Sequence, residues 1–156
     1  MYVFDTGPLI NLFNHYYPDR FPTLWKNFEL LVSNEKIVSV REVANEIESH
    51  HEVDRLVEWA RNNRKFFSQP TQDELLMVAE IFKVTHYQAM IRKKELLKGK
   101  PVADPFVIAK AKACNGWVVT REKWKENSAQ IPNVCGHFGI PWTNLEGFMK
   151  KEGWTF

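Results

Sequence analysis

The sequence has few of the features that would set it apart from ordinary globular proteins. Its 156 residues include only two cysteines, seven glycines and eight prolines. This composition excludes collagen-like, low-complexity and coiled-coil chains. Cys114 and Cys135 lie outside any Cys-x-x-Cys or Cys/His spacing, so they predict reduced thiols rather than a disulfide framework or a zinc site. We therefore expect a single domain over residues 1–156.

Long hydrophobic runs and a strong charge of either sign are also missing. Apolar runs such as residues 117–119 are far shorter than the roughly 18 residues that a membrane helix needs. The first residues lack a basic segment and reach an acid already at Asp5, which predicts no signal peptide. We expect a cytoplasmic protein without a membrane segment. The net charge of +2 is only weak support for a polyanionic partner.

Short β-branched and aromatic runs alternate with helical patterns along the chain. We expect strands over residues 2–5, 37–40 and 117–120. We expect helices over residues 8–13, 24–32, 43–50, 53–60, 71–82, 87–97 and 104–114. Residues 131–142 mix proline and glycine with apolar residues, so we expect an extended segment and an edge strand there. Strands separated by helices predict an α/β domain with a mostly parallel sheet.

Acidic residues fall near one end of this predicted sheet. Asp5 closes the first strand, and Glu122 lies just after the third. Asp104 opens a helix, and Glu46 lies on the helix after the second strand, one turn beyond Glu42. Helix capping or a surface position would explain each acid taken singly. Together they point to a site, because ligands of open parallel sheets bind outside the carboxyl ends of the strands.

Clustered carboxylates repel one another, and a divalent cation removes that repulsion. Mg²⁺ and Mn²⁺ prefer oxygen ligands. A metal held in this way suits phosphodiester hydrolysis, since it activates a water and neutralises charge on the transferring phosphate. The sequence has no Walker A, His-Glu-x-x-His or Gly-x-Ser-x-Gly motif, so the parts for rival chemistries are missing.

The same acids lie in segments that resemble the four motifs of the PIN-domain family. The first segment resembles a hydrophobic strand that ends in Asp-Thr, and the last acid of the second matches Glu46. The segments are residues 2–10 (YVFDTGPLI), 39–47 (SVREVANEI), 103–111 (ADPFVIAKA) and 118–122 (VVTRE). The resemblance runs from residue 2 to about residue 145. It is close to an uncharacterised PIN subfamily of this length that carries the segment IPNVC, residues 131–135.

The resemblance implies a three-layer α/β/α PIN-like fold with a mostly parallel central sheet. It also implies a ribonuclease that uses Mg²⁺ or Mn²⁺ and is commonly the toxin of a toxin–antitoxin pair, with RNA as substrate and an antitoxin protein as partner. Carried over by position, the metal ligands and catalytic residues are Asp5, Glu46, Asp104 and Glu122, and Thr120 is a further catalytic residue that orients a water or a carboxylate.

Two positions depart from the family pattern. Glu122 stands where the family usually has Asp, and Gly7 stands where it usually has Asn or Ser. Thr120 is explained equally well as an ordinary strand residue. Three alternatives stay open: a housekeeping nuclease, a DNA-directed nuclease with the same site, and a non-catalytic PIN-like module that binds nucleic acid or protein. A homodimer is a further expectation that the sequence leaves open.

Basic and aromatic residues provide candidates for nucleic-acid binding. The basic candidates are Lys93, Lys94, Lys98, Lys100 and Arg121. The lysines crowd the approach to Asp104, where they can hold the phosphates of a strand, although a solvated helix face explains them as well. Trp25 and Trp124 are the tryptophans that we expect to be exposed, with rings on which a base could stack.

Overall fold

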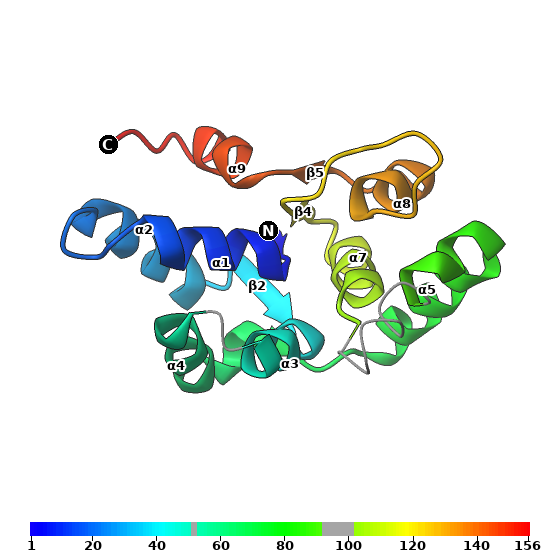
Figure 1. Cartoon of the computed structure of the whole chain (residues 1–156), viewed down its shortest axis with the longest axis horizontal. Helices are drawn as coiled ribbons and strands as arrows, with labels where there is room; N and C mark the ends of the chain where they lie inside the picture. Colours follow the sequence, from blue (N-terminus) through cyan, green and yellow to red (C-terminus); the bar gives the residue numbers. More distant parts are fainter. Residues whose placement is uncertain (51–52, 92–101) are drawn as a thin grey trace.

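The structure, a computed structural model, describes residues 1–50, 53–91 and 102–156, and its strands form one parallel sheet (Figure 1). The strands are β1 (Tyr2–Phe4), β2 (Ile37–Val40), β3 (Phe67–Ser68), β4 (Trp117–Val119) and β5 (Trp142–Thr143). Their order across the sheet is β3-β2-β1-β4-β5, and every neighbouring pair is parallel. This arrangement confirms the predicted α/β class.

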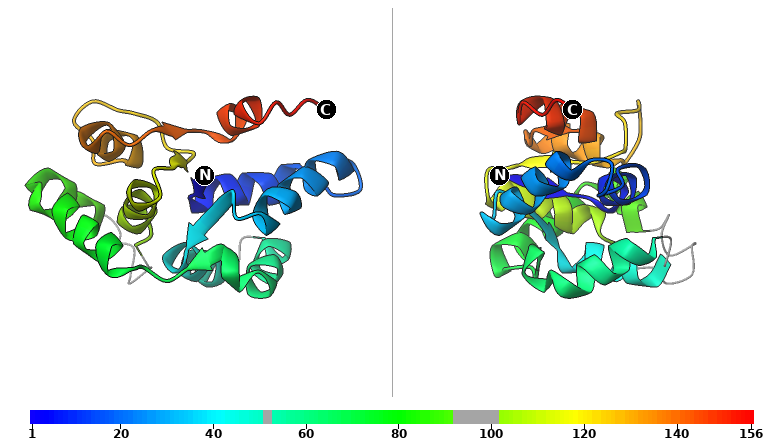
Figure 2. Two further views of the ribbon diagram at one scale, coloured as in Figure 1. Left: turned by 180° about the vertical axis from the view of Figure 1, so that it is seen from behind. Right: turned by 90° about the vertical axis from the view of Figure 1, so that its left-hand side faces the viewer.

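Helices connect the strands and surround the sheet (Figure 2). The α-helices are α1 (Thr6–His15), α2 (Pro22–Ser33), α3 (Arg41–His50), α4 (Asp54–Asn62), α5 (Gln72–Lys83), α7 (Asp104–Ala113), α8 (Ile131–Phe138) and α9 (Leu145–Lys151). Two 3₁₀ turns, η1 (Arg64–Phe66) and η2 (Thr85–Gln88), lie between them.

The connections place helices on both faces of the sheet. The chain runs from β1 through β2 to β3, then returns past β1 to β4 and β5. Because crossovers between parallel strands are right-handed, the two directions put their helices on opposite faces. Phe4 packs edge-on against Phe28 of α2 and Phe148 of α9, while α7 contacts β1, β2 and β4. The result is a three-layer arrangement in which strand order reverses between β1 and β4.

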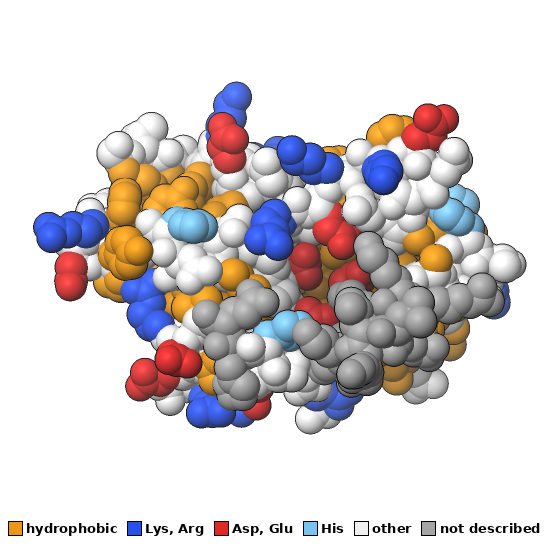
Figure 3. All heavy atoms as spheres, viewed as in Figure 1, with side chains coloured by type: hydrophobic (Ala, Val, Ile, Leu, Met, Phe, Trp, Pro, Cys, Tyr) orange, Lys and Arg blue, Asp and Glu red, His pale blue; other side chains and the backbone are white. Residues whose placement is uncertain are grey.

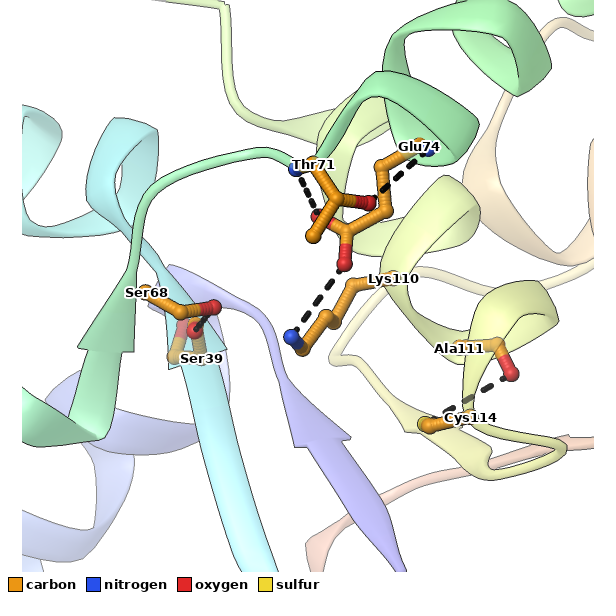
Figure 4. Close-up of polar contacts among 7 residues, drawn as sticks. All are labelled: Ser39, Ser68, Thr71, Glu74, Lys110, Ala111 and Cys114. Carbon is orange, nitrogen blue, oxygen red and sulfur yellow. Dashed lines mark hydrogen bonds and ion pairs between the residues drawn. The ribbon is translucent and has the colours of Figure 1, made fainter.

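Helix α5 begins where the sequence predicts. Thr71 Oγ1 accepts a hydrogen bond from Glu74 N (3.3 Å), and the Glu74 carboxylate accepts one from Thr71 N (3.4 Å), which completes a capping box (Figure 4). Glu74 also pairs with Lys110 of α7, with Nζ and Oε1 3.2 Å apart. The same carboxylate therefore caps α5 and joins it to α7.

One predicted segment is wrong: residues 131–138 are not extended but form α8. Pro132 lies in the first turn of α8, where its missing N–H costs no intrahelical hydrogen bond, and Gly139 ends the helix at φ 65°. Ile131, Val134 and Cys135 form its buried face. The proline and the glycine thus mark the two ends of a helix, and the edge strand β5 follows as expected.

Two smaller expectations also need correction. Asp104 is the first residue of α7 rather than its cap, since the N-cap is Ala103. Strand β3 was not expected, because two residues show no periodicity. The helix expected over residues 87–97 extends beyond residue 91 into a part of the chain outside the described residues, where the structure does not test it.

Candidate active site

Asp5 lies at the point where strand order reverses, directly after β1. It is the N-cap of α1, and its Oδ1 accepts a hydrogen bond from Thr6 N (2.7 Å). Its Oδ2 accepts one from Thr120 Oγ1 (3.0 Å), and its own N–H donates to Val119 O (2.9 Å). Only 8% of Asp5 is exposed. The ends of β1 and β4 therefore hold this carboxylate in a fixed, buried position.

Glu46 joins three helices at the same edge of the sheet. It extends from α3 and accepts a hydrogen bond from Thr6 Oγ1 of α1 at Oε2 (2.6 Å). Its Oε1 accepts one from the N–H of Ala103, the residue before Asp104 (3.2 Å). Glu46 and Asp104 are both buried. The hydroxyl and the backbone N–H bring the acid of the second motif to the acids of the first and third.

The electrostatics of Asp5 show that the other three acids lie within reach of it. The pKa of Asp5 is raised to about 7, first by burial and then by the negative charges of Asp104, Glu46 and Glu122, in that order, while the hydrogen bond from Thr6 N lowers it. Acidic side chains gather near the middle of the face in Figure 3. The structure thus brings together the four acids that the sequence singles out; their catalytic roles stay a prediction.

Glu122 and Thr120 lie at the end of β4. The hydroxyl of Thr120 is fully buried, donates to Asp5 and accepts a hydrogen bond from Glu122 N (3.1 Å). Glu122 Oε2 accepts a hydrogen bond from Ile131 N at the start of α8 (2.7 Å). Thr120 is therefore more than a strand residue, because it couples two of the acids. The longer side chain of Glu122 reaches the first turn of α8.

The donor set fits a hard divalent cation in its chemistry, but the carboxylates are not arranged around one. All four candidate ligands supply carboxylate oxygens, which Mg²⁺ and Mn²⁺ prefer. Within residues 1–50, 53–91 and 102–156, however, no three His, Cys, Asp or Glu side chains are placed to hold a metal ion. Glu46 and Glu122 instead accept hydrogen bonds from Ala103 and Ile131.

Arg121 lies beside the acids, whereas the other basic candidates are not described. Together with Lys123 it lines a pocket of about 410 Å³ that adjoins Thr120 and extends between α1 and the start of α9. A Cβ on Gly7 would lie 3.0 Å from Arg121 Cβ, so glycine lets the two segments approach closely. Lys93, Lys94, Lys98 and Lys100 lie outside the described residues.

The two tryptophans expected at the surface, Trp25 and Trp124, differ in their exposure to solvent. Trp124 is 60% exposed, as expected. The expectation for Trp25 is wrong, because its ring packs edge-on against Phe13 and Phe28, and its Nε1 donates to Tyr16 O (2.7 Å). Only Trp124 therefore stays available for stacking.

Two buried polar residues near the site were not predicted to have a role in it. Ser39 is fully buried in β2 and donates a hydrogen bond to Phe4 O (2.6 Å), which fixes the backbone just before Asp5. Glu42 is 7% exposed and pairs with Arg41, and within the described residues its Oε2 has no hydrogen-bond partner. The four-residue spacing from Glu46 was the signal for Glu42; Ser39 had none beyond its place in a strand.

Comparison with known proteins assigns the chain to a family. Residues 2–156 match the family described as a domain of unknown function (DUF4411), and the protein belongs to that family. No match was found among curated proteins. Among solved structures the chain is similar to one from the crystal structure of VapBC2 from Rickettsia felis bound to a DNA fragment from their promoter, with 14% identity and a TM-score of 0.48 over 92% of this chain and 97% of that chain. Across the described ranges no helix is long and apolar enough to cross a membrane.

Proposed function

We propose that this protein is an endoribonuclease that depends on Mg²⁺ or Mn²⁺ and acts as the toxin of a toxin–antitoxin pair. The observation that carries the proposal is the gathering of Asp5, Glu46, Asp104 and Glu122 where strand order reverses, with the pKa of Asp5 raised to about 7 by burial and by the other three. Burying like charges is costly unless a cation offsets them. Such a cluster is typical of a metal site rather than of a structural core.

In this proposal Asp5, Glu46, Asp104 and Glu122 hold the cation. When bound, the metal would lower the pKa of a water and neutralise charge on the phosphate. Thr120 holds the Asp5 carboxylate through its hydroxyl, and Thr6 does the same for Glu46. Both hydroxyls keep their carboxylates at the sheet edge.

The choice of RNA and of a toxin role rests on the four segments that resemble PIN-domain motifs. Arg121 and Lys123 support a polyanionic substrate, because they put two positive charges in the pocket beside Thr120. Lys93, Lys94, Lys98 and Lys100 are proposed as further phosphate contacts, an antitoxin protein as partner, a homodimer as the assembly and the cytoplasm as location.

The test compares two glutamates on the same helix. Glu46→Gln is expected to abolish metal-dependent cleavage of a labelled RNA while the protein stays folded. The glutamine amide can still form hydrogen bonds with the Thr6 hydroxyl and with Ala103 N, but it has no negative charge with which to bind the metal. Glu42→Gln is the matched control, since Glu42 is 7% and Glu46 6% exposed, and it is expected to retain most of the activity. Cleavage is measured with Mn²⁺, with Mg²⁺ and with EDTA, on an RNA and on a DNA of the same sequence.

Three results would contradict the proposal in different ways. Loss of activity in Glu42→Gln but not in Glu46→Gln would show that the acid of the second motif is Glu42, one helical turn before Glu46. Preferred cleavage of DNA would favour the DNA-directed nuclease. RNA binding by the wild type without cleavage in either metal would favour the non-catalytic module.

A further inference from the structure

A second pocket is lined in part by the segment that follows Glu122. Its volume is about 510 Å³, and it lies between η2, residues 124–128 and α8. Its lining includes His86, Trp124, Asn127, Ser128, Gly136 and His137. Trp124 is 60% exposed, whereas each of the other five tryptophans is partly buried. An exposed indole on a pocket wall is therefore peculiar to this place in the molecule.

The segment that carries Trp124 is held firmly. The side chain of Asn133 on α8 accepts a hydrogen bond from Lys125 N (3.3 Å) and donates one to Lys125 O (2.7 Å). Ser128 N donates to the same carbonyl (3.2 Å), and Glu122 binds the start of α8 through Ile131 N. Since this backbone is already ordered, little conformational entropy is lost when a ligand binds the pocket.

The chemistry of the pocket suits a flat aromatic ligand with a polar edge. Trp124 offers a ring face for stacking, and the Tyr87 and His137 rings lie edge to face with centroids 5.5 Å apart. Asn127 and Ser128 bring hydrogen-bonding side chains to the same wall. Aromatic faces combined with such polar groups recognise unpaired nucleobases, which stack on the ring and bond through their edges.

The pocket lies close to Glu122, one of the four acids, along the chain. Trp124 follows Glu122 by two residues, so their Cα atoms are separated by no more than about 7 Å. Arg121 and Lys123, from the same segment, line the pocket beside Thr120. A strand with a phosphate at the carboxylates can therefore have its backbone near the two cations while a neighbouring base reaches the indole.

We propose that the Trp124 pocket binds one unpaired nucleobase adjacent to the cleaved phosphodiester, which makes RNA with a single-stranded nucleotide at that position the substrate class. This inference rests on the proposed nuclease function. A base within a continuous duplex is stacked and paired on both sides, so it does not present its face to the indole. The pocket thus selects for loops, bulges and single strands.

The test measures binding of a short single-stranded oligoribonucleotide, and of the same strand annealed to its complement, in EDTA. Trp124→Ala is expected to raise the Kd for the single strand by roughly 5- to 150-fold, the loss that corresponds to one stacked base. Trp124→Phe should restore most of the affinity. Phe156→Ala is the matched control, because Phe156 is 59% exposed and belongs to the C-terminal end, and it should bind as the wild type does.

The salt dependence separates stacking from electrostatics. The slope of log Kd against log salt should be unchanged in Trp124→Ala, because the indole carries no charge, and it should flatten in Arg121→Gln/Lys123→Gln. Duplex binding should be the same in Trp124→Ala and wild type. Thermal unfolding of each variant checks that the exposed substitution leaves the fold intact.

The outcomes distinguish this inference from the function on which it rests. If the wild type binds and cleaves RNA but Trp124→Ala binds the single strand equally well, the pocket has another occupant, such as a protein partner, and the inference is overturned while the nuclease stands. Equal weakening of single-strand and duplex binding would also overturn it. If the wild type neither binds nor cleaves RNA, the proposed function fails first and the inference fails with it.

Discussion

Glu74 and Asp5 are both buried carboxylates, yet Glu74 has a positively charged neighbour and Asp5 has negatively charged ones. Glu74 is 2% exposed and has the Lys110 ammonium at 3.2 Å and the N–H of Thr71 at 3.4 Å. Asp5 is 8% exposed, accepts hydrogen bonds from Thr6 and Thr120, and has three negatively charged neighbours that raise its pKa.

The difference separates a structural acid, Glu74, from Asp5, which we propose binds a metal. A buried carboxylate with a cation and a backbone N–H holds two helices together. A buried carboxylate among other carboxylates opposes folding and is kept only where the repulsion serves a purpose, such as binding a cation. Burial alone would not have distinguished Glu74 from Asp5; the charge of their neighbours does.

The largest expected effect comes from removing the structural acid. Glu74→Ala deletes half of the capping box and leaves the Lys110 ammonium, whose side chain is 18% exposed, without this partner. The free energy of unfolding should fall by about 3–5 kcal/mol, as is typical when one partner of a buried pair is removed. Urea denaturation measures the loss. In the control Glu80→Ala, which removes the exposed pair with Lys83, the change should be within about 0.5 kcal/mol.

Substitution of Asp5 should change the free energy of unfolding in the opposite direction. Asp5→Asn removes a negative charge that is repelled by the neighbouring acids. The amide oxygen can still accept the hydrogen bond from Thr6 N, and the amide NH₂ can donate one to the Thr120 hydroxyl oxygen. In metal-free buffer at pH 8 the free energy of unfolding should rise by about 2–4 kcal/mol, since each unit of raised pKa corresponds to about 1.4 kcal/mol. A variant less stable than the wild type would show that Asp5, like Glu74, is held by favourable charges.

The dependence of stability on pH sharpens the same comparison. Because the pKa of Asp5 is raised from 3.8 to about 7 in the folded protein, the folded state binds more protons than the unfolded state between these values. The stabilising contribution of protonated Asp5 to the free energy of unfolding is therefore fully present below about pH 4 and is lost as the pH rises to about 7. Relative to Asp5→Asn, the metal-free wild type should lose about 1 kcal/mol per pH unit in this window. Parallel curves for the two proteins would contradict the raised pKa.

Local sequence signals predicted most of the framework and the location of the acids. Three kinds of signal involve only residues that are close in the sequence, so they can be recognised without a structure. They are the apolar runs of β1, β2 and β4, the Thr71 capping box and Asp104-Pro105. Once a parallel sheet is expected, acids that follow its strands are expected at one edge. Asp5 and Glu122 meet there for this reason.

Contacts between distant residues could not be predicted. The pair of Lys110 with Glu74 spans 36 residues, and the bond from Ala103 N to Glu46 spans 57. Because α8 was not predicted, neither the bond from Ile131 N to Glu122 nor the pocket behind Trp124 could be foreseen. Strand β3, with two residues, forms only because β2 offers it a partner.

The central claim is that the acids at the reversal of strand order form a metal site, and Mn²⁺-dependent thermal unfolding tests it most directly. A ligand that binds only the folded state at 100 times its Kd adds about 2.7 kcal/mol, which raises the Tm of a chain of this size by roughly 5–10 °C. We expect this rise in the wild type, no rise in Asp5→Asn or Asp104→Asn, and a full rise in the Glu80→Ala control. A wild type whose Tm is the same with Mn²⁺ and with EDTA, or an Asp104→Asn variant that retains the rise, would contradict the claim.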